Sequence, residues 1–378
     1  MRDENDQLQA GTLPADPLVG AAPMEGTPEA EVARAAAELS EQRVGTWLAD
    51  AWERLLARGR GEERPIPTPW PVVDQALSGG IWPGLHVLVG GTGTGKSQWA
   101  LQLALHAALQ GTPVLYIGLE LGRVDLAARL LGLISHRRWS RLYLGRDGQG
   151  RTTTDELDQV ADRHTADIER LEKAPIYLEV CPPMGWSYTE LHRKALALRE
   201  LHPELAGRRG SKPMLLVLDF LQLVGSPEGG NEDLRERIGR AAYAGRAVAR
   251  DLDAAVLLLS STSRANYGAL TVNDAGKREP AAALVGLGKE SGEVEYAADS
   301  VLVFVRRKTE GPRKVWSQVD VAVAKARAPS EALLAADGWL ELEFNGGRFR
   351  EPGGEGDVDD PDEDPPSSAP PYDSRGFR

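Results

Sequence analysis

Eight residues in the first third of the chain combine glycines, one amine and one hydroxyl at a fixed spacing. Residues 90–97 are GGTGTGKS, which fits the pattern G-x-x-x-x-G-K-[ST]. A β-branched apolar run precedes this segment and a helical pattern follows it. Glycines let the main chain approach an anion closely, and the helix that follows turns its N-terminal amides and dipole toward that anion. The segment therefore predicts a loop that binds the phosphates of a nucleoside triphosphate.

Two side chains of this loop have separate predicted roles. The Lys96 ammonium supplies a positive charge for the β- and γ-phosphates, and the Ser97 hydroxyl can coordinate Mg²⁺. The contrary interpretation is a glycine-rich turn with an incidental lysine, but the full eight-residue match and its flanks favour the phosphate loop. The predicted nucleotide contacts are Gly90, Gly91, Thr92, Gly93, Thr94, Gly95, Lys96, Ser97 and Gln98.

Two acidic residues stand where apolar, strand-like runs end. Asp219 closes the run MLLVLD, and Glu120 comes just after VLYIG. Because the carboxyl ends of parallel strands meet at one edge of a sheet, we predict that Asp219 reaches the loop and holds Mg²⁺. Glu120 is a candidate for orienting or deprotonating a water molecule. From the residues alone, Asp219 could instead cap a turn, and Glu120 could be an acid at a helix N-terminus.

The elements that must position these residues alternate between strands and helices. Continuous apolar, β-branched runs predict strands buried on both faces of a mostly parallel sheet; they are GLHVLVG, TPVLYIG, APIYLEV, PMLLVLD, AAVLLLS, DSVLVFV and VDVAVAK. Helical patterns lie between them, at 97–109, 123–135, 154–172, 188–201 and 232–252. This order predicts an α/β fold with helices on both faces of a central sheet. The segment WLELEFNGGRFRE adds a C-terminal β-hairpin around Asn345-Gly346.

Composition divides the 378 residues into four segments. Residues 1–26 are rich in Pro, Gly, Ala and acid, and we expect them to be disordered. Residues 27–62 contain an amphipathic, linker-type helix, and the proline-rich link RGEERPIPTPWP that follows should be extended. Residues 63–350 form the predicted α/β domain, and residues 351–378 an acidic, Pro-rich disordered tail.

The net charge of −12 comes from the two ends of the chain. Residues 1–40 carry eight acidic and two basic side chains and residues 351–378 carry nine and two, which leaves residues 41–350 at +1. This neutral middle neither excludes nor supports nucleic-acid binding, and the acidic tail is a candidate site for a protein partner. The single Cys181 excludes an internal disulfide, and no apolar run approaches the roughly 20 residues of a membrane span. We therefore expect a cytoplasmic protein without a membrane partner.

Together these segments resemble the RecA-type ATPase domain of the DnaB family of replicative helicases. The family's glutamate segment is similar to GLELGRVDLAARLLGLIS, and its Walker B run, typically Asp-Tyr-Leu-Gln-Leu, is similar to DFLQL at 219–223. The approach IPTPWPVVDQALSGGIWPG and the later KESGEVEYAADSVLVFVRR resemble further family segments. The resemblance covers about residues 43–350 and implies a RecA-like P-loop NTPase fold, with ATP as the nucleotide and Mg²⁺ as its cofactor.

The resemblance also implies roles for individual residues. Glu120 matches the family's catalytic glutamate. Lys325 and Arg327, in VAVAKARAP, match a Lys-x-Arg that reaches the γ-phosphate bound by the adjacent subunit; a solvated strand end is the alternative. Arg306 matches a position beside the nucleotide base. The helix at 41–58 matches a linker helix that docks on a neighbouring subunit, so a homo-oligomer, a hexameric ring, is expected.

Single-stranded DNA is a partner expected from the resemblance more than from charge. In this fold, loops after the Walker B strand and the next strand line the centre of a ring, and here they are residues 225–233 and 266–287. They hold few cations for a strongly salt-dependent binder. The candidate DNA contacts are Arg264, Lys277 and Arg278.

Two departures from the family pattern bear on function. Where the family has Ser-Gln-Leu-Asn-Arg, residues 260–264 are SSTSR, so Ser261 replaces the glutamine that senses the nucleotide. Only about 40 largely polar residues precede the linker helix, where the family normally carries a helical N-terminal domain that meets primase. We therefore do not predict a contact with primase.

Three functions stay open at this stage. The favoured one is an ATP-hydrolysing, hexameric helicase or translocase acting on single-stranded DNA in replication. The second is a RecA-like, DNA-dependent ATPase in recombination, repair or regulation that does not unwind processively, which the two departures favour. The third is a nucleotide-gated assembly protein whose acidic tail binds the partner.

Overall fold

The computed structural model describes residues 28–118, 120–147, 149–180, 188–203, 213–219, 234–262, 271–272, 280–285, 292–307 and 316–353. The predicted disorder at residues 1–26 lies outside these ranges, as does most of the predicted disordered tail. The chain divides into two compact units, Met1–Glu62 and Glu63–Arg378, and each is described by itself.

The first unit contains two helices where the sequence predicted one helical stretch. They are α1 (Pro28–Glu41) and α2 (Val44–Gly59). The break falls at Arg43, whose backbone is extended, and the Thr46 hydroxyl donates to the carbonyl of Glu41. A threonine side chain that satisfies a carbonyl in this way competes with helix continuation. The large apolar side chains of α2 are exposed; they are Val44, Trp47, Leu48, Trp52, Leu55 and Leu56.

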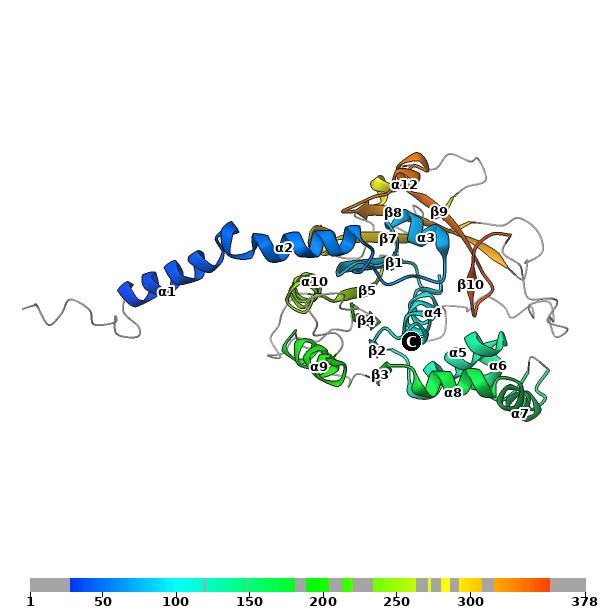
Figure 1. Ribbon diagram of the computed structural model, residues 1–378. Helices are drawn as coiled ribbons and strands as arrows, with labels where there is room; N and C mark the ends of the chain where they lie inside the picture. The colour runs from blue at the N-terminus through cyan, green and yellow to red at the C-terminus, as the bar shows by residue number, and fades with distance from the viewer. Residues whose placement is uncertain are drawn as a thin grey trace, which may run out of the picture. The chain divides into compact units, whose positions relative to one another are not determined.

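The second unit is built on one sheet (Figure 1). Among the described residues, its strand order is β10-β9-β8-β7-β1-β5-β4-β2-β3, with β6 beside β7. The strands are β1 (Gly84–Gly90), β2 (Val114–Gly118), β3 (Ile176–Val180), β4 (Leu215–Asp219), β5 (Ala255–Ser261), β6 (Thr271–Val272), β7 (Ser300–Arg307), β8 (Ser317–Ala326), β9 (Trp339–Phe344) and β10 (Phe349–Arg350).

The sheet is parallel from β7 to β3 and antiparallel from β7 to β10. The central parallel strands are continuous apolar runs buried on both faces, as predicted. The edge strand β3 is the exception, because only one neighbour among the described strands covers it and Tyr177 and Val180 are exposed. The antiparallel part contains the predicted hairpin, in which the Asn345 side chain accepts hydrogen bonds from the N–H groups of Gly347 and Arg348. Because they are parallel, the six strands from β7 to β3 point their carboxyl ends to the same edge.

Two hydrophobic clusters fill the space between this sheet and its helices. Alternate residues of β1 divide between them: Leu85, Val87 and Val89 join α9, α10 and α11, whereas Leu88 joins α3, α4 and α5. The helices of this unit are α3 (Pro71–Ala76), α4 (Lys96–Leu109), α5 (Arg123–Ser135), α6 (Trp139–Leu144), α7 (Thr154–Arg163), α8 (Thr165–Lys173), α9 (Tyr188–Leu201), α10 (Leu234–Asp251), α11 (Gly292–Ala297) and α12 (Glu331–Ala335). A 3₁₀ helix spans Ala281–Leu284.

Two expectations about helices were wrong in detail. The stretch 154–172 is two helices, because the chain leaves helical geometry at His164 and the Thr165 hydroxyl donates to the carbonyl of Ala161. The proline-rich link begins with a turn at Arg60 and Gly61 and ends at Trp70, after which Pro71 opens α3. Proline is well suited to the first position of a helix, since its missing N–H would have no intrahelical partner there.

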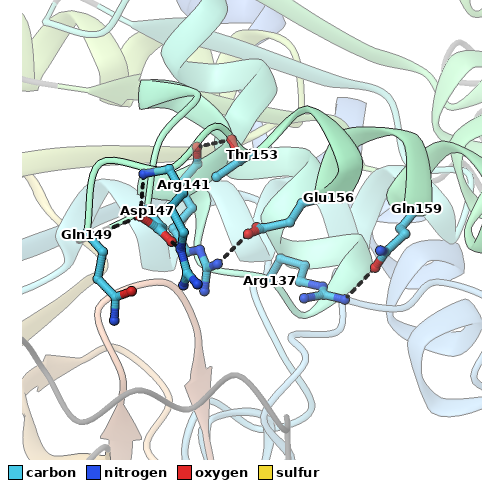
Figure 2. A network of polar contacts seen from close by, with 8 residues as sticks. Arg137, Arg141, Asp147, Gln149, Thr153, Glu156 and Gln159 are labelled. Carbon is cyan, nitrogen blue, oxygen red and sulfur yellow. Dashed lines mark hydrogen bonds and ion pairs between the residues drawn. The ribbon is translucent and has the colours of Figure 1, made fainter.

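A polar network ties α6 to α7 (Figure 2). Arg141 of α6 forms an ion pair with Glu156 of α7, and both side chains are largely buried. The connecting loop is closed by Asp147, whose carboxylate accepts the N–H of Gln149, and by the Thr153 hydroxyl, which donates to the carbonyl of Arg141. The network therefore holds α6, α7 and the loop between them together.

No helix within the described part of the chain is both long enough and apolar enough to cross a membrane.

Candidate nucleotide site

The loop between β1 and α4 lies at the carboxyl edge of the parallel strands. Its backbone is left-handed at Gly93 (φ +72°) and at Gly95 (φ +96°). The Thr94 hydroxyl donates to the carbonyl of Gly91 at 2.8 Å, which closes the turn. Because α4 begins at Lys96, its first N–H groups have no partner within the helix and face the loop. This geometry provides the anion cradle that the sequence predicts.

Aromatic rings of the C-terminal hairpin support the loop. A Cβ atom on Gly95 would lie 2.7 Å from the Phe349 ring and 3.0 Å from the Phe344 ring, so only glycine fits. The main chain of Phe349 exchanges two hydrogen bonds with the Gln102 side chain of α4, each 2.9 Å long. The ring also packs against the buried Trp70, with the centroids 6.2 Å apart. The hairpin is therefore a structural support of the phosphate loop, a role that the sequence did not reveal.

Lys96 is buried within the loop. Its Nζ donates to the carbonyls of Gly90, at 2.9 Å, and Gly91, at 3.0 Å. Burial lowers the pKa of Lys96 to about 8, although the nearby carboxylates of Asp219 and Glu120 act in the opposite direction. The ammonium is thus charged at neutral pH but has a much weaker hold on its proton than an exposed lysine.

Asp219 is the acidic centre of the site. It ends β4, is only 2% exposed, and its two oxygens have different partners. The Ser97 hydroxyl donates to Oδ1 at 3.0 Å, and the Tyr116 hydroxyl donates to Oδ2 at 2.6 Å. Ser97 and Asp219 thereby present two oxygen donors side by side, which is the ligand type that Mg²⁺ prefers. The residues present fit this ion.

The pKa shifts around Asp219 have identifiable causes. Burial raises the pKa of Asp219, while the hydrogen bonds from Tyr116 and Ser97 act to lower it. Burial, together with the negative charge of Asp219, raises the pKa of Tyr116 well above its usual value, so this residue remains a hydrogen-bond donor. Tyr116 is fully buried on β2 and was not among the residues singled out from the sequence.

Glu120 is exposed just beyond the carboxyl end of β2. Gly118, the last residue of that strand, pairs with Asp219 of β4, which brings Glu120 to the same edge. Its charge opposes the lowering of the pKa of Lys96 by burial and adds to the raising of the pKa of Asp219 by burial. The structure thus brings together Lys96, Ser97, Asp219 and Glu120.

Gln98 faces away from solvent toward α5. Its Oε1 accepts a hydrogen bond from Arg129 at 3.0 Å, and Arg129 is held in turn by Asp125 at 2.5 Å. Arg129 also lies over the Trp139 ring, 3.8 Å from its centroid. Gln98 therefore links the start of α4 to α5, a structural role that does not depend on nucleotide.

The other predicted residues lie elsewhere. Lys325 and Ala326 end β8, where Ala326 pairs with Ser300 at the start of β7. Ser300 also pairs with His86, which lies four residues before the end of β1. At about 3.3 Å per residue, His86 is about 13 Å along the strand from the phosphate loop. Arg327 follows directly, so this Lys-x-Arg lies at the opposite end of β1. The backbone of Arg306 belongs to β7, and its side chain lies outside the described part, as do Arg264, Lys277 and Arg278.

A parallel sheet with a glycine-rich loop before a helix, a lysine and serine at its end, and an aspartate on a neighbouring strand defines the class of RecA-like P-loop NTPases. The family described as DnaB-like helicase C terminal domain matches residues 65–335, and the chain belongs to that family. Membership implies nucleotide binding at the loop.

Relatives and solved structures agree with this assignment. A replicative DNA helicase DnaB of Leifsonia xyli subsp. xyli is 27% identical over 284 residues, which are 73% of this chain and 54% of that protein. A replicative DNA helicase DnaB of Synechocystis is 29% identical over 231 residues, covering 60% of this chain and 23% of that one. The chain thus spans about half, or less, of the curated relatives it matches.

Two solved structures share the fold. One is an ATPase domain with a TM-score of 0.63 and 19% identity, and the match covers 82% of this chain and 98% of that one. The other, a DnaB-like replicative helicase solved in a study of its interactions with primase, has a TM-score of 0.62 and 19% identity over 81% of this chain and 66% of that one.

Proposed function

We propose that this chain is an ATP-hydrolysing motor that assembles into a homo-oligomeric ring, a hexamer, in the cytoplasm and translocates on single-stranded DNA in replication. The observation that carries the proposal is the convergence of Lys96, Ser97 and Asp219 at the phosphate loop. Membership of the DnaB-like family supports the link from this site to a helicase-type motor.

The residues at the loop support phosphoryl transfer to water. The N–H groups of residues 90–97 would bind the phosphate oxygens, and the Lys96 ammonium would leave its two carbonyl partners for the β- and γ-phosphates. Ser97 and Asp219 would hold Mg²⁺, which neutralises charge on the phosphates. Glu120, exposed at the same edge, is suited to orient the attacking water.

The position of Lys325 and Arg327 supports assembly. They lie at the opposite end of β1 from the phosphate loop, too far to reach a nucleotide bound by their own chain. A cation in that place can stabilise the transition state only in a site on another copy. The exposed tryptophans of α2, Trp47 and Trp52, supply an apolar face of the kind that docks on a neighbour.

One observation favours the alternative of a DNA-dependent ATPase without processive unwinding. Ser261 ends β5 and pairs with Gly90, the first residue of the phosphate loop. A glutamine here would extend well beyond the strand end, whereas a serine hydroxyl stays close to the main chain. In this alternative, hydrolysis responds to DNA, but its coupling to strand separation is weak.

Three measurements on the full chain test the proposal. The ATPase rate is measured with and without single-stranded DNA, a forked duplex is used for strand displacement, and native mass gives the number of subunits. Displacement that requires ATP and is absent in Lys96→Ala supports the motor. Stimulation by DNA without displacement supports the alternative, and hydrolysis indifferent to DNA contradicts both.

A further inference from the structure

Asp299 is fixed at four points immediately before β7. Its N–H donates to the Leu85 carbonyl at 2.6 Å, and its Oδ2 accepts the Leu85 N–H at 2.8 Å. Its own carbonyl accepts the Arg327 N–H at 2.9 Å, and its Oδ1 forms an ion pair with Nη2 of Arg327 at 2.7 Å, without the N–H direction of a hydrogen bond. The side chain of Asp299 is 15% exposed, whereas that of Arg327 is 64% exposed.

The main chain leaves room for this carboxylate at one place. Gly84, just before Leu85, has a φ of +152°, and a Cβ atom there would lie 2.7 Å from Oδ2 of Asp299. Any larger residue would displace the carboxylate. Glycine is therefore required for Asp299 to receive the Leu85 N–H and hold Arg327 at the same time.

The chain that follows Arg327 is also tied down. The Ser78 hydroxyl donates to the Ala328 carbonyl at 3.0 Å, and the Ser330 N–H points to the Ala76 carbonyl at 3.4 Å. Together with the Arg327 N–H, these bonds fix the backbone on both sides of the guanidinium. What Asp299 adds is the orientation of the side chain.

We propose that Asp299 is a positioning residue that aims Arg327 at the nucleotide bound by a neighbouring copy of this chain. The inference rests on the proposed trans-acting role of Arg327. An ion pair with a largely exposed arginine contributes little to folding stability, so its value lies in restricting a flexible side chain before it meets the phosphate. The contact with Asp299 is an ion pair and not a hydrogen bond, so the exposed guanidinium of Arg327 keeps N–H donors with which to contact an anion.

The substitution Asp299→Asn separates the two functions of the carboxylate. Asparagine keeps an oxygen that accepts the Leu85 N–H, but it removes the charge that orients Arg327. We expect the turnover number to fall about tenfold, with nucleotide affinity and the unfolding midpoint unchanged, because misaligning a catalytic cation affects the chemical step. The matched control is Glu190→Gln, which breaks the exposed pair between Glu190 and Arg193 on α9 and should leave turnover unaltered.

Mixed assemblies distinguish positioning from damage to the fold. When Asp299→Asn subunits are co-assembled with an excess of Lys96→Ala subunits, the phosphate loop of most Asp299→Asn subunits faces a neighbour with an intact Asp299–Arg327 pair. Turnover per intact phosphate loop should then equal that of wild-type subunits co-assembled with the same excess of Lys96→Ala. A defect that persists under dilution, or an Asp299→Asn variant with undiminished or increased turnover alone, overturns the inference. If Arg327→Ala keeps its ATP turnover, the proposed role of Arg327 is overturned. If Arg327→Ala loses turnover but Asp299→Asn turns over ATP normally, only the positioning role of Asp299 is overturned.

Discussion

Lys96 combines the charge that a phosphate requires with an environment that disfavours charge. It is 9% exposed, and two loop carbonyls accept hydrogen bonds from its ammonium. Burial lowers the pKa of Lys96 from 10.5 to about 8, so protonating it opposes folding at neutral pH, and this penalty fades as the pH rises from about 8 to 10.5. A bound polyanion would reverse that balance, so we expect the lysine to contribute strongly to nucleotide binding.

Nucleotide affinity should therefore depend on pH in the alkaline range. Below pH 8 Lys96 is protonated before the nucleotide arrives, and above it the protein must take up a proton on binding. We expect the affinity for ATP to fall about tenfold per pH unit above about pH 8, measured by fluorescence titration from pH 7 to 9.5. Lys96→Ala should bind weakly with no such slope. If the ATP affinity of the wild-type protein is also independent of pH in this range, Lys96 does not have a pKa of about 8.

Tyr116 determines how Asp219 presents its oxygens. Its hydroxyl occupies Oδ2, which leaves Oδ1 beside Ser97, where a metal ion fits. In Tyr116→Phe a buried carboxylate loses a donor, which typically costs about 1–3 kcal/mol, and the pKa of Asp219 rises further. Because protonated Asp219 cannot hold Mg²⁺, the Mg²⁺-dependent part of ATP affinity should disappear at a higher pH than in wild type.

The measurement compares ATP affinity with Mg²⁺ and with EDTA between pH 5 and 8. Tyr177→Phe is the matched control, since Tyr177 lies on the adjacent strand β3 and its hydroxyl contacts His202 instead. The role assigned to Tyr116 fails if both phenylalanine variants keep the wild-type Mg²⁺ profile.

Residues of the site could be predicted from the sequence where their role depends on nearby residues in the chain, and not where it depends on residues far apart in the sequence. Lys96 and Ser97 stand in a short pattern with a local physical reason, and Asp219 closes a recognisable apolar strand. Tyr116 could not be found in this way, because every residue of its strand is apolar or aromatic and only the register of β2 against β4 puts the hydroxyl beside Asp219. Asp299 was likewise visible only as part of a family-like segment, without its partner Arg327.

At the level of elements, the turn from β1 to α4 depends on a hairpin that lies about 250 residues further along the chain. Phe344 and Phe349 stack with their centroids 4.3 Å apart, and both rings contact the space beside Gly95. The hairpin itself was predicted from Asn345-Gly346, since turn chemistry is local. The contact of the hairpin with the phosphate loop was not predicted, because nothing in the local sequence indicates which surface the hairpin covers.

Helix boundaries, too, were predicted where they follow from apolar spacing and missed where they depend on a single side chain. The stretches at 123–135 and 188–201 were predicted to the residue, because apolar spacing defines them. The break at His164 and the start of α3 at Pro71 depend on single side chains and were missed. A hydroxyl that satisfies a nearby carbonyl and a proline at the first position of a helix are both weak signals against a strong periodic pattern.

Two glycines of the loop allow the hairpin support to be measured. Gly93 and Gly95 are both left-handed, but a Cβ atom on Gly93 meets nothing within 4 Å, whereas one on Gly95 meets the Phe349 ring at 2.7 Å. Gly93→Ala should lower the free energy of unfolding by about 1–2 kcal/mol, from backbone strain alone. Gly95→Ala should cost about 1–3 kcal/mol more, from overpacking, in denaturant titrations without nucleotide.

A double substitution assigns that difference to the hairpin. In a Phe349→Ala background the space beside Gly95 opens, and the two alanine variants should become nearly equal in stability relative to that background. If Gly95→Ala and Gly93→Ala already cost the same in the wild-type chain, the aromatic rings do not constrain the loop.

Within the second unit, the two edges of the parallel strands carry different functional groups. The phosphate loop, Asp219 and Glu120 lie at the carboxyl edge of the parallel strands, whereas Arg327 and Asp299 lie at the edge where those strands begin. If Arg327 is the catalytic cation, a chain with its nucleotide site at one end and that cation at the other would complete the site head to tail. Head-to-tail contacts that close generate rings. ATP turnover would then require assembly.

Co-assembly of two inactive variants tests this most directly. Lys96→Ala lacks a functional phosphate loop but keeps Arg327, and Arg327→Ala keeps the loop but lacks the cation. Each alone should be without ATP turnover, while their mixture, assembled together and verified by native mass to contain both subunits, should regain turnover at sites where an intact loop faces an intact Arg327. A mixed assembly as inactive as its components, although Arg327→Ala subunits still bind ATP, would show that the two ends of the molecule do not share one site.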